Sequence, residues 1–462
     1  MYGDPLEPVE LGASIFVKVN RNLVSAVERF NLSTLEYAGE DLGGIMKALG
    51  IWNGEEFVFK QSDASYNWWN NVKLLWKYGM SPIRTQRLMK DTVNRFLAMY
   101  DSPNFPFRSI SETAFNLGLM ASSMPSETLL AENNIYAPFS TDIIQAATRV
   151  NYAQNLAQIH GLEAMVCMAA NGAMSVQGGN WLIFDHMLRH DNNTVLLNTS
   201  VTSISLKQDG QGYSIKSSST PSHGVEVGLH SSVEDFDTVI IAAPLQYSNI
   251  SIDPVPTYIP SPIPYVTLYV TLFTSPYRLN PFYFGVRDPS EVPTTILTTL
   301  PPNGQDPPPF FSLSTLRTVF NLKIQPPRKE YVYKLFSPDQ PRFSHLAKML
   351  DVPPGTHSWS SIYEDPNIIT WQYNKTWHSY PYLPPRVTFD DPQLDAQGSL
   401  WYTSGIESFI STMETSSLMG KNVAQLIADG WRRDQASEQS KDGETEGLVM
   451  QEDERWRRGV ET

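Results

Sequence analysis

Residues 400–427, LWYTSGIESFISTMETSSLMGKNVAQLI, constrain the fold of this chain more than any other segment. The apolar residues before Gly405 predict a strand, and those that recur from about Thr412 onward predict a helix. A strand that turns tightly into a helix directs the helix N-terminus, with its unpaired N–H groups and positive dipole end, back toward the turn. Such an end can hold a phosphate or the electron-rich edge of a heterocycle. The segment therefore predicts a cofactor site.

The usual partner of such a site does not occur in the sequence. A dinucleotide-binding turn reads G-x-G-x-x-G directly after a first strand, with an acidic residue near the end of the next strand. None of the 462 residues form this pattern. The sequence thus predicts one part of a dinucleotide site without the other.

Composition excludes several classes of function. With 34 basic and 48 acidic residues the net charge is -14, which opposes binding to nucleic acid. The single cysteine, Cys167, cannot form an internal disulfide and lacks the companions of a zinc or iron–sulfur site, so no metal is expected. No apolar run is long enough to predict a spanning helix, and the first residues do not read as a secretory signal.

The first half of the chain is predicted to be largely helical. Residues 21–30 and 42–50 read as short helices, 66–100 carries two apolar stripes at helical spacing, and 140–170 continues the block. The tryptophan-rich stretch 67–79 is interpreted as a core helix, with a wall of a lipid tunnel or a peripheral membrane contact as alternatives.

Strand character follows from about residue 194. TVLLNTSVTSISLKQ, GYSIKSS, VEVGLH and FDTVIIAAP read as successive strands, the last as a buried parallel strand covered on both faces. Two long β runs at 265–273 and 294–300, with 331–336 after them, predict a larger mixed sheet. Residues 433–462 are too polar to bury a core and are predicted to be a disordered tail.

Three short segments are candidates for a cofactor site. In the C-terminal one, Glu407 would accept hydrogen bonds from a polyol, and the N–H groups near Met413 and Glu414 would face an electron-accepting ring. An ordinary turn capped by Ser411 or Thr412 explains the same residues equally simply.

The second candidate is the pair Gly178 and Gly179, which opens a helix and would let the backbone approach a cofactor closely, or would form a plain turn. The third is ELGASIF at 10–16, a strand-like segment where Gly12 and Ala13 could make room for a flat ring or for a close helix contact. His160 and His378 have neither a metal spacing nor a nucleophile beside them and receive no catalytic role.

In colinear order, eight segments resemble the prenylcysteine oxidase (prenylcysteine lyase) family. They are ELGASIF, WWNNVKLLWKYGMSPIR, TRVNYAQN, VQGGNWL, DTVIIAAPL with SNIS, YVYKLFS, WHSYPYLPP and LWYTSGIESFISTMETSS, within residues 10–417. The family begins with a βαβ unit that carries the glycine-rich turn. Because this sequence starts beyond that unit, we expect a flavin domain that is incomplete at its N-terminus.

The resemblance implies an α/β fold with an amine-oxidase-like FAD/NAD(P)-binding domain and an α+β substrate domain that contains the mixed sheet. The expected flavin domain comprises 1–45, 170–250 and 386–432, and the substrate domain 46–169 and 251–385. The implied reaction is oxidation of farnesyl- or geranylgeranyl-cysteine by noncovalent FAD and molecular oxygen, which yields cysteine, a prenyl aldehyde and hydrogen peroxide in the breakdown of prenylated proteins.

The resemblance also assigns residues. Gly12, Ala13, Gly178, Gly179, Gly405, Glu407, Met413 and Glu414 would contact the cofactor, and Val201 would offer its backbone to adenine. Asn151 or Tyr152 would guide the attacking water. A lysosomal, vacuolar or secreted glycoprotein is implied, in line with five sequons at Asn31, Asn192, Asn198, Asn249 and Asn374.

Two alternatives remain from the residues themselves. A truncated chain without the dinucleotide turn would bind no FAD and would be an inactive remnant or a lipid-binding protein. An amine- or polyene-oxidising flavoprotein would use the same fold.

Overall fold

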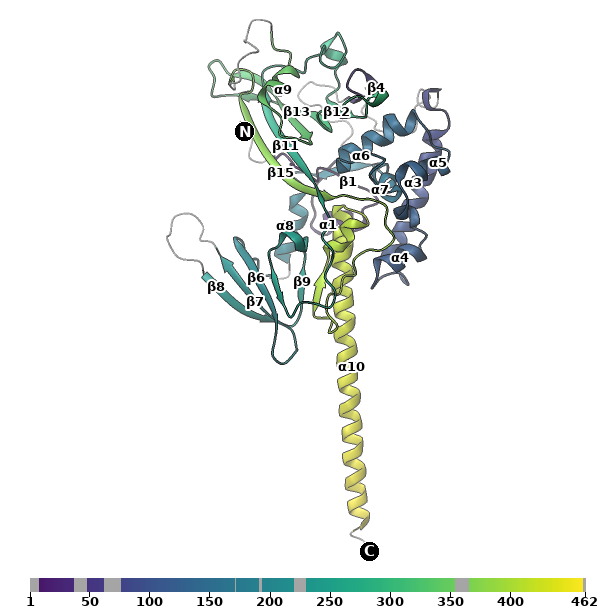
Figure 1. The fold of residues 1–462 in the computed structure, drawn as a ribbon. Helices are drawn as coiled ribbons and strands as arrows, with labels where there is room; N and C mark the ends of the chain where they lie inside the picture. The colour runs from purple at the N-terminus through teal and green to yellow at the C-terminus, as the bar shows by residue number, and fades with distance from the viewer. Residues whose placement is uncertain are drawn as a thin grey trace.

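The computed structural model describes residues 8–36, 48–61, 76–170, 172–190, 193–219, 230–353 and 365–459. Figure 1 shows a body that combines a large sheet with a block of helices, a smaller sheet to one side, and one long C-terminal helix. Within these ranges, the helices lack the combination of length and apolar character that crossing a membrane requires. The predicted tryptophan-rich helix falls mostly on 62–75, outside the described residues.

The largest sheet has seven strands in the order β15-β11-β14-β13-β12-β3-β4. They are β3 (Leu49–Trp52), β4 (Phe57–Gln61), β11 (Tyr265–Ser275), β12 (Thr295–Thr298), β13 (Ser312–Asn321), β14 (Arg328–Ser337) and β15 (Trp371–Pro381). Only β12 and β3 run parallel, and the other neighbours are antiparallel. The predicted mixed sheet is therefore confirmed.

The remaining strands form three small sheets. The sheet β10-β6-β7-β8 contains β6 (Thr199–Leu206), β7 (Tyr213–Ser219), β8 (His230–Phe236) and β10 (Ser251–Asp253). A parallel pair joins β9 (Val239–Ile241) to β16 (Leu400–Tyr402), and β1 (Phe16–Val17), β5 (Ala173–Val176) and β2 (Thr34–Glu36) form an antiparallel sheet. These sheets bring the first, middle and last parts of the chain together.

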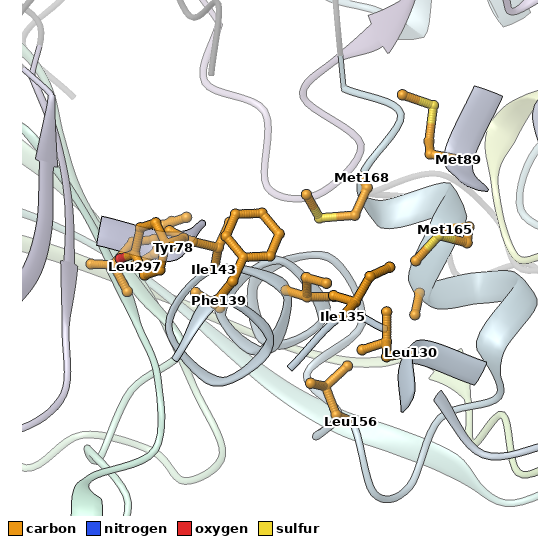
Figure 2. Packing of buried hydrophobic residues seen from close by; sticks show 14 of the residues in the cluster. Tyr78, Met89, Leu130, Ile135, Phe139, Ile143, Leu156, Met165, Met168 and Leu297 are labelled. Atoms are coloured by element: carbon orange, nitrogen blue, oxygen red, sulfur yellow. The ribbon is translucent and has the colours of Figure 1, made fainter. Parts of the chain in front are cut away.

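Nine α-helices are described. They are α1 (Arg21–Arg29), α3 (Ser81–Leu97), α4 (Ile110–Asn116), α5 (Ser126–Glu132), α6 (Gln145–Tyr152), α7 (Gly161–Cys167), α8 (Trp181–Arg189), α9 (Phe343–Lys348) and α10 (Met413–Gly459). Figure 2 shows how the block packs: Phe139 and Ile143 stand between Leu297 of the sheet and Met165 of α7. One apolar core thus fixes α6 and α7 against β12.

Three expectations differ from the structure. Leu49 and Gly50, placed in a helix over 42–50, lie in β3, where β12 provides a hydrogen-bonding partner that the local pattern does not reveal; 42–47 is outside the described residues. Of the segment 10–16, only Phe16 lies in a strand, as the first residue of β1. In β9, Ile240 is 44% exposed while Val239 and Ile241 are buried, so the strand is parallel as predicted but covered on one face only.

The predicted disordered tail also differs, because α10 continues to Gly459 and projects away from the body in Figure 1. Its last turns contain many Glu, Arg and Gln residues. These residues favour a helix because their intrinsic helix propensity is high. The prediction rested on polarity, which carries no information on local helix formation.

Candidate active site

A cavity of about 860 Å³ is lined by residues from five of the eight segments that carry the resemblance. Its walls come from residues 12–20, the end of α6, the end of α7, the faces of β12 to β14, Tyr380 of β15, and the start of α10. The volume is within the range of sites for small molecules and cofactors. Gly12, Ala13, Asn151, Tyr152, Met413 and Glu414 are among the lining residues.

The N-terminus of α10 opens onto this cavity. Thr412 and Thr415 cap the helix reciprocally: the Thr415 N–H donates to the Thr412 hydroxyl (3.1 Å), and the Thr412 N–H donates to the Thr415 hydroxyl (3.1 Å). Among the described residues, the backbone N–H groups of Met413 and Glu414 have no acceptor. The start of α10, with two N–H groups free of a described acceptor, therefore borders the cavity, and its contact with a cofactor stays a prediction.

The glycine pair fixes the segment 10–14 that forms the opposite wall. Gly178 and Gly179 have φ values of +89° and +110°, which L-residues rarely adopt. The turn presents Asn180, whose N–H donates to Glu10 Oε1 (2.6 Å) and whose Nδ2 donates to the Ala13 carbonyl (2.8 Å). The pair thus positions Gly12 and Ala13, although neither glycine lines the cavity itself.

We expect Gly179→Ala to loosen this wall. An added Cβ would lie 2.6 Å from Trp181 Cδ1 and 3.0 Å from Glu10 Oε1, in a backbone conformation that alanine disfavours. The strain should lower the free energy of unfolding by about 1–3 kcal/mol, measurable as a lower midpoint of thermal unfolding. Gly210→Ala is a suitable control, because Gly210 also has a positive φ but meets nothing within 4 Å; an equal effect in both variants would contradict the contact argument.

Lys334 is a cavity residue that the sequence analysis missed. Its Nζ donates to the Glu10 carbonyl (3.1 Å) and to the Ser14 hydroxyl (3.0 Å), and it lies 5.2 Å from the Phe336 ring centre. Burial lowers the pKa of Lys334 to about 8, with Glu10 opposing the change. A lysine within the apolar strand YVYKLF is the signal that could have identified it.

The carboxylate of Glu414 binds α1, a contact that the sequence did not predict. Although Glu414 lines the cavity, its Oε1 accepts from Asn22 N (2.8 Å) and from the Tyr100 hydroxyl (2.6 Å), and its Oε2 accepts from Leu23 N (3.0 Å). The side chain therefore satisfies the first turn of α1, which has no side-chain cap of its own.

Three other predicted cofactor residues do not line this cavity. Glu407 accepts from the Tyr265 hydroxyl (2.9 Å), and Gly405 is packed so closely that a Cβ would lie 2.9 Å from the Asp390 carbonyl. Val201 lies in β6 among the apolar residues of the small sheet. The predicted cofactor residues therefore meet around this cavity only in part. Gly405 packs against the Asp390 backbone, and Glu407 binds Tyr265 of β11.

Asn151 and Tyr152 end α6 at the cavity wall. Asn151 Nδ2 donates to the Ala147 carbonyl (3.0 Å), and the Tyr152 hydroxyl donates to the Ser411 carbonyl (3.1 Å) beside the α10 N-terminus. Tyr152 also packs edge-on against Tyr380, with ring centres 5.2 Å apart. Their role toward water stays a prediction.

Neither of the two histidines named in the sequence analysis lines the cavity. His160 is buried, and its Nδ1 accepts from Glu163 N (3.2 Å) at the start of α7. Burial lowers the pKa of His160 to about 3, so the ring is neutral. His378 stacks on Tyr247 with ring centres 4.8 Å apart.

Comparison with solved structures places the fold. The chain matches a triple mutant of putrescine oxidase with a TM-score of 0.52 and 13% identity, over 91% of this chain and 88% of that one. It matches cyclohexylamine oxidase from Brevibacterium oxydans with a TM-score of 0.50 and 13% identity, over 93% and 90% of the two chains. The fold is therefore of the amine-oxidase-like flavin class.

Sequence comparison defines the family. A family model described as prenylcysteine lyase matches residues 61–440. The chain is 29% identical to farnesylcysteine lyase from Arabidopsis thaliana over 438 residues, which is 90% of this chain and 77% of the relative. It is 27% identical to prenylcysteine oxidase 1 from Rattus norvegicus over 453 residues, 91% and 79% of the two chains. The chain belongs to the prenylcysteine lyase family.

The residues present fit a flavin. The free N–H groups of Met413 and Glu414 suit an electron-rich ring edge, and small residues at 12 and 13 leave space beside it. The rest of the cavity is mainly apolar, with Val93, Phe96, Ile143, Val150 and Leu297 in its walls. The start of α10 and these apolar side chains thus line the same cavity.

Proposed function

We propose that this protein is a FAD-dependent thioether oxidase that cleaves S-prenyl-cysteine to cysteine, a prenyl aldehyde and hydrogen peroxide, with molecular oxygen as the acceptor. The observation that carries the proposal is the cavity in which the α10 N-terminus meets an apolar extension, in a chain of the prenylcysteine lyase family. Its role would be the breakdown of prenylated proteins.

The bound flavin would supply hydride acceptance from the carbon between sulfur and the alkene. The chain's own task is to hold and orient the partners. The Met413 and Glu414 N–H groups would hold the ring edge, while the Asn180 turn fixes the wall at Gly12 and Ala13. An apolar channel that aligns the thioether carbon is the main requirement for hydride removal, because the resulting allylic cation is stabilised by sulfur, and water must then reach this carbon.

The proposal is tested with purified protein loaded with FAD. S-farnesyl-cysteine should yield hydrogen peroxide, free thiol and farnesal in equal amounts, whereas putrescine and cyclohexylamine should yield none. Peroxide from an amine but not from S-farnesyl-cysteine would favour the amine-oxidising alternative. Protein that binds neither FAD nor the thioether would favour the inactive alternative.

We expect Ala147→Phe to raise KM for S-geranylgeranyl-cysteine by about tenfold, and less for the shorter farnesyl compound. Ala147 lines the cavity and packs beside the core of Figure 2, so a larger side chain should shorten the channel. The added ring would remove at least one or two methylene-sized spaces from the channel, and such a loss weakens substrate binding by about 1–3 kcal/mol. Ala131→Phe on the exposed side of α5 is the control; equal KM values for Ala147→Phe and wild type would place the isoprenoid elsewhere.

We further propose a lysosomal, vacuolar or secreted location for this glycoprotein. The sequon residues Asn31, Asn198, Asn249 and Asn374 are exposed and accessible to glycosylation, and Asn192 lies outside the described residues. A peripheral membrane contact would suit a lipid-derived substrate, and Trp76 is 91% exposed beside Lys77. Endoglycosidase treatment of the protein from its native cells, with a shift in mass, tests the location.

A further inference from the structure

A buried carboxyl group lies directly behind the cavity wall. Glu163 of α7 is 0% exposed, and its carboxyl oxygens form no hydrogen bond of ordinary geometry with a described residue, although the Tyr152 hydroxyl and the Ser411 backbone lie close enough to favour its ionised form. A buried polar group without partners is costly, so its presence calls for a reason. Fold stability does not supply one, because an apolar residue of similar size would fill the same space.

The groups that face Glu163 belong to the cavity. Tyr152 of α6, Cys167 one turn later on α7, and Ser411 before α10 all line it, as does Tyr380 of β15 beside Tyr152. No lysine or arginine pairs with the Glu163 carboxyl within the described part of the chain. The Glu163 carboxyl is therefore surrounded by neutral side chains and by the backbone at Ser411, next to the start of α10.

Among Glu163, Tyr152, Cys167 and Tyr380, Glu163 is the residue that changes charge near neutral pH. Burial raises the pKa of Glu163 to about 8, with Tyr152 and the Ser411 backbone opposing the rise. Burial also raises the pKa of Tyr152 and of Cys167 well above their ordinary values, and raises the pKa of Tyr380 to about 12. The neighbouring His160 is neutral because burial lowers its pKa, to which Arg386 contributes.

Tyr152 connects this carboxyl to the cavity. Its hydroxyl donates to the Ser411 carbonyl (3.1 Å), which leaves the oxygen lone pairs free to accept a proton. Tyr152 lines the cavity and Glu163 does not, and among the cavity groups that face Glu163 this hydroxyl can both accept and donate a proton, so it can connect the carboxyl to a bound molecule.

We propose that Glu163, acting through the Tyr152 hydroxyl, accepts the proton released when water adds to the oxidised thioether carbon. This inference rests on the proposed function. After hydride loss to the flavin, the substrate carbon is a cation: a C–O bond forms with water, and one O–H bond of that water breaks. The Tyr152 hydroxyl turns from the Ser411 carbonyl to the Glu163 carboxylate, gives it its own proton, and takes up the proton of the water. The C–S bond then breaks, and the proton of the new hydroxyl ends on the cysteine sulfur, which leaves an aldehyde.

The first test is the pH profile of turnover by the flavin-loaded protein. For wild type, kcat/KM for S-farnesyl-cysteine should rise with pH toward a plateau above about pH 8, since only the ionised carboxyl accepts a proton. Glu163→Gln should lose this rise and fall at least about tenfold below the wild-type plateau. Tyr152→Phe should lose the same rise, and Glu127→Gln on the exposed face of α5 should keep it. A rise that persists in Glu163→Gln would overturn the inference.

The second test does not depend on activity. A carboxyl whose pKa is raised from 4.5 to about 8 in the folded state stabilises the protein fully below pH 4.5, and this contribution is lost as pH rises to 8. The thermal midpoint of wild type should therefore fall relative to Glu163→Gln across this window. If the thermal midpoints of wild type and Glu163→Gln change in parallel between pH 4.5 and 8, the inference is overturned. Absence of wild-type peroxide at every pH would instead refute the proposed function, and the inference with it.

Discussion

Replacing Glu414 with alanine is expected to destabilise the protein by about 3–5 kcal/mol, the largest effect of any single substitution considered. Its carboxylate accepts from Asn22 N, Leu23 N and the Tyr100 hydroxyl, and the side chain is only 2% exposed. Alanine would leave three donors without an acceptor, at about 1–3 kcal/mol each before relaxation. It would also detach α1 from the start of α10, and so loosen the cavity wall.

The midpoint of thermal unfolding measures this loss. Glu414→Gln keeps one acceptor oxygen in the same place and should recover part of the stability. Glu112→Ala, at an exposed position in the first turn of α4, is the matched control for loss of a carboxylate near a helix start. A Glu414→Ala variant as stable as Glu112→Ala would show that the contact between α1 and α10 contributes little.

Replacing Met413 with proline is expected to weaken FAD binding by about 10–100-fold while leaving α10 intact. Met413 is the first residue of α10, a position where proline is well tolerated because its missing N–H would otherwise have no partner in the helix. The substitution therefore removes one free donor that faces the cavity and little else. A hydrogen bond to a charged ring edge contributes about 1.5–3 kcal/mol, which gives the stated range.

Fluorescence titration of the flavin-free protein with FAD tests this expectation. Met413→Leu retains the N–H group and a similar volume, so it should bind as wild type does. Circular dichroism checks that the helix content of Met413→Pro is unchanged. Equal FAD affinity in the proline and leucine variants would mean that this donor does not contact the cofactor.

Local patterns predicted the elements that carry their own signal. The strand and helix at 400–427 follow from apolar spacing, and β11 and β14 from their β-branched and aromatic runs. The mixed sheet was predicted, but the pairing of β3 with β12 was not, because residues 49–52 and 295–298 are far apart in the sequence. Pairing of distant segments is a tertiary event that no short window contains.

Several residues that line the cavity were named from the sequence, but their hydrogen-bond partners were not. Free N–H groups at Met413 and the position of Tyr152 follow from local spacing and from the family resemblance. That the Glu414 carboxylate binds the start of α1 could not be predicted, because the partner residues lie nearly 400 positions away, as the contact to Leu23 shows. Lys334 and Glu163 were missed because burial, which gives them their unusual pKa values, is a property of the packed protein.

Anaerobic mixing of the FAD-loaded protein with S-farnesyl-cysteine tests the central claim most directly. The account predicts that the visible absorption of the oxidised flavin is lost in a single turnover, with one equivalent of farnesal and one of free thiol per flavin, and that putrescine leaves the spectrum unchanged. A flavin that stays oxidised with the prenyl thioether, or that is reduced by putrescine instead, would contradict it.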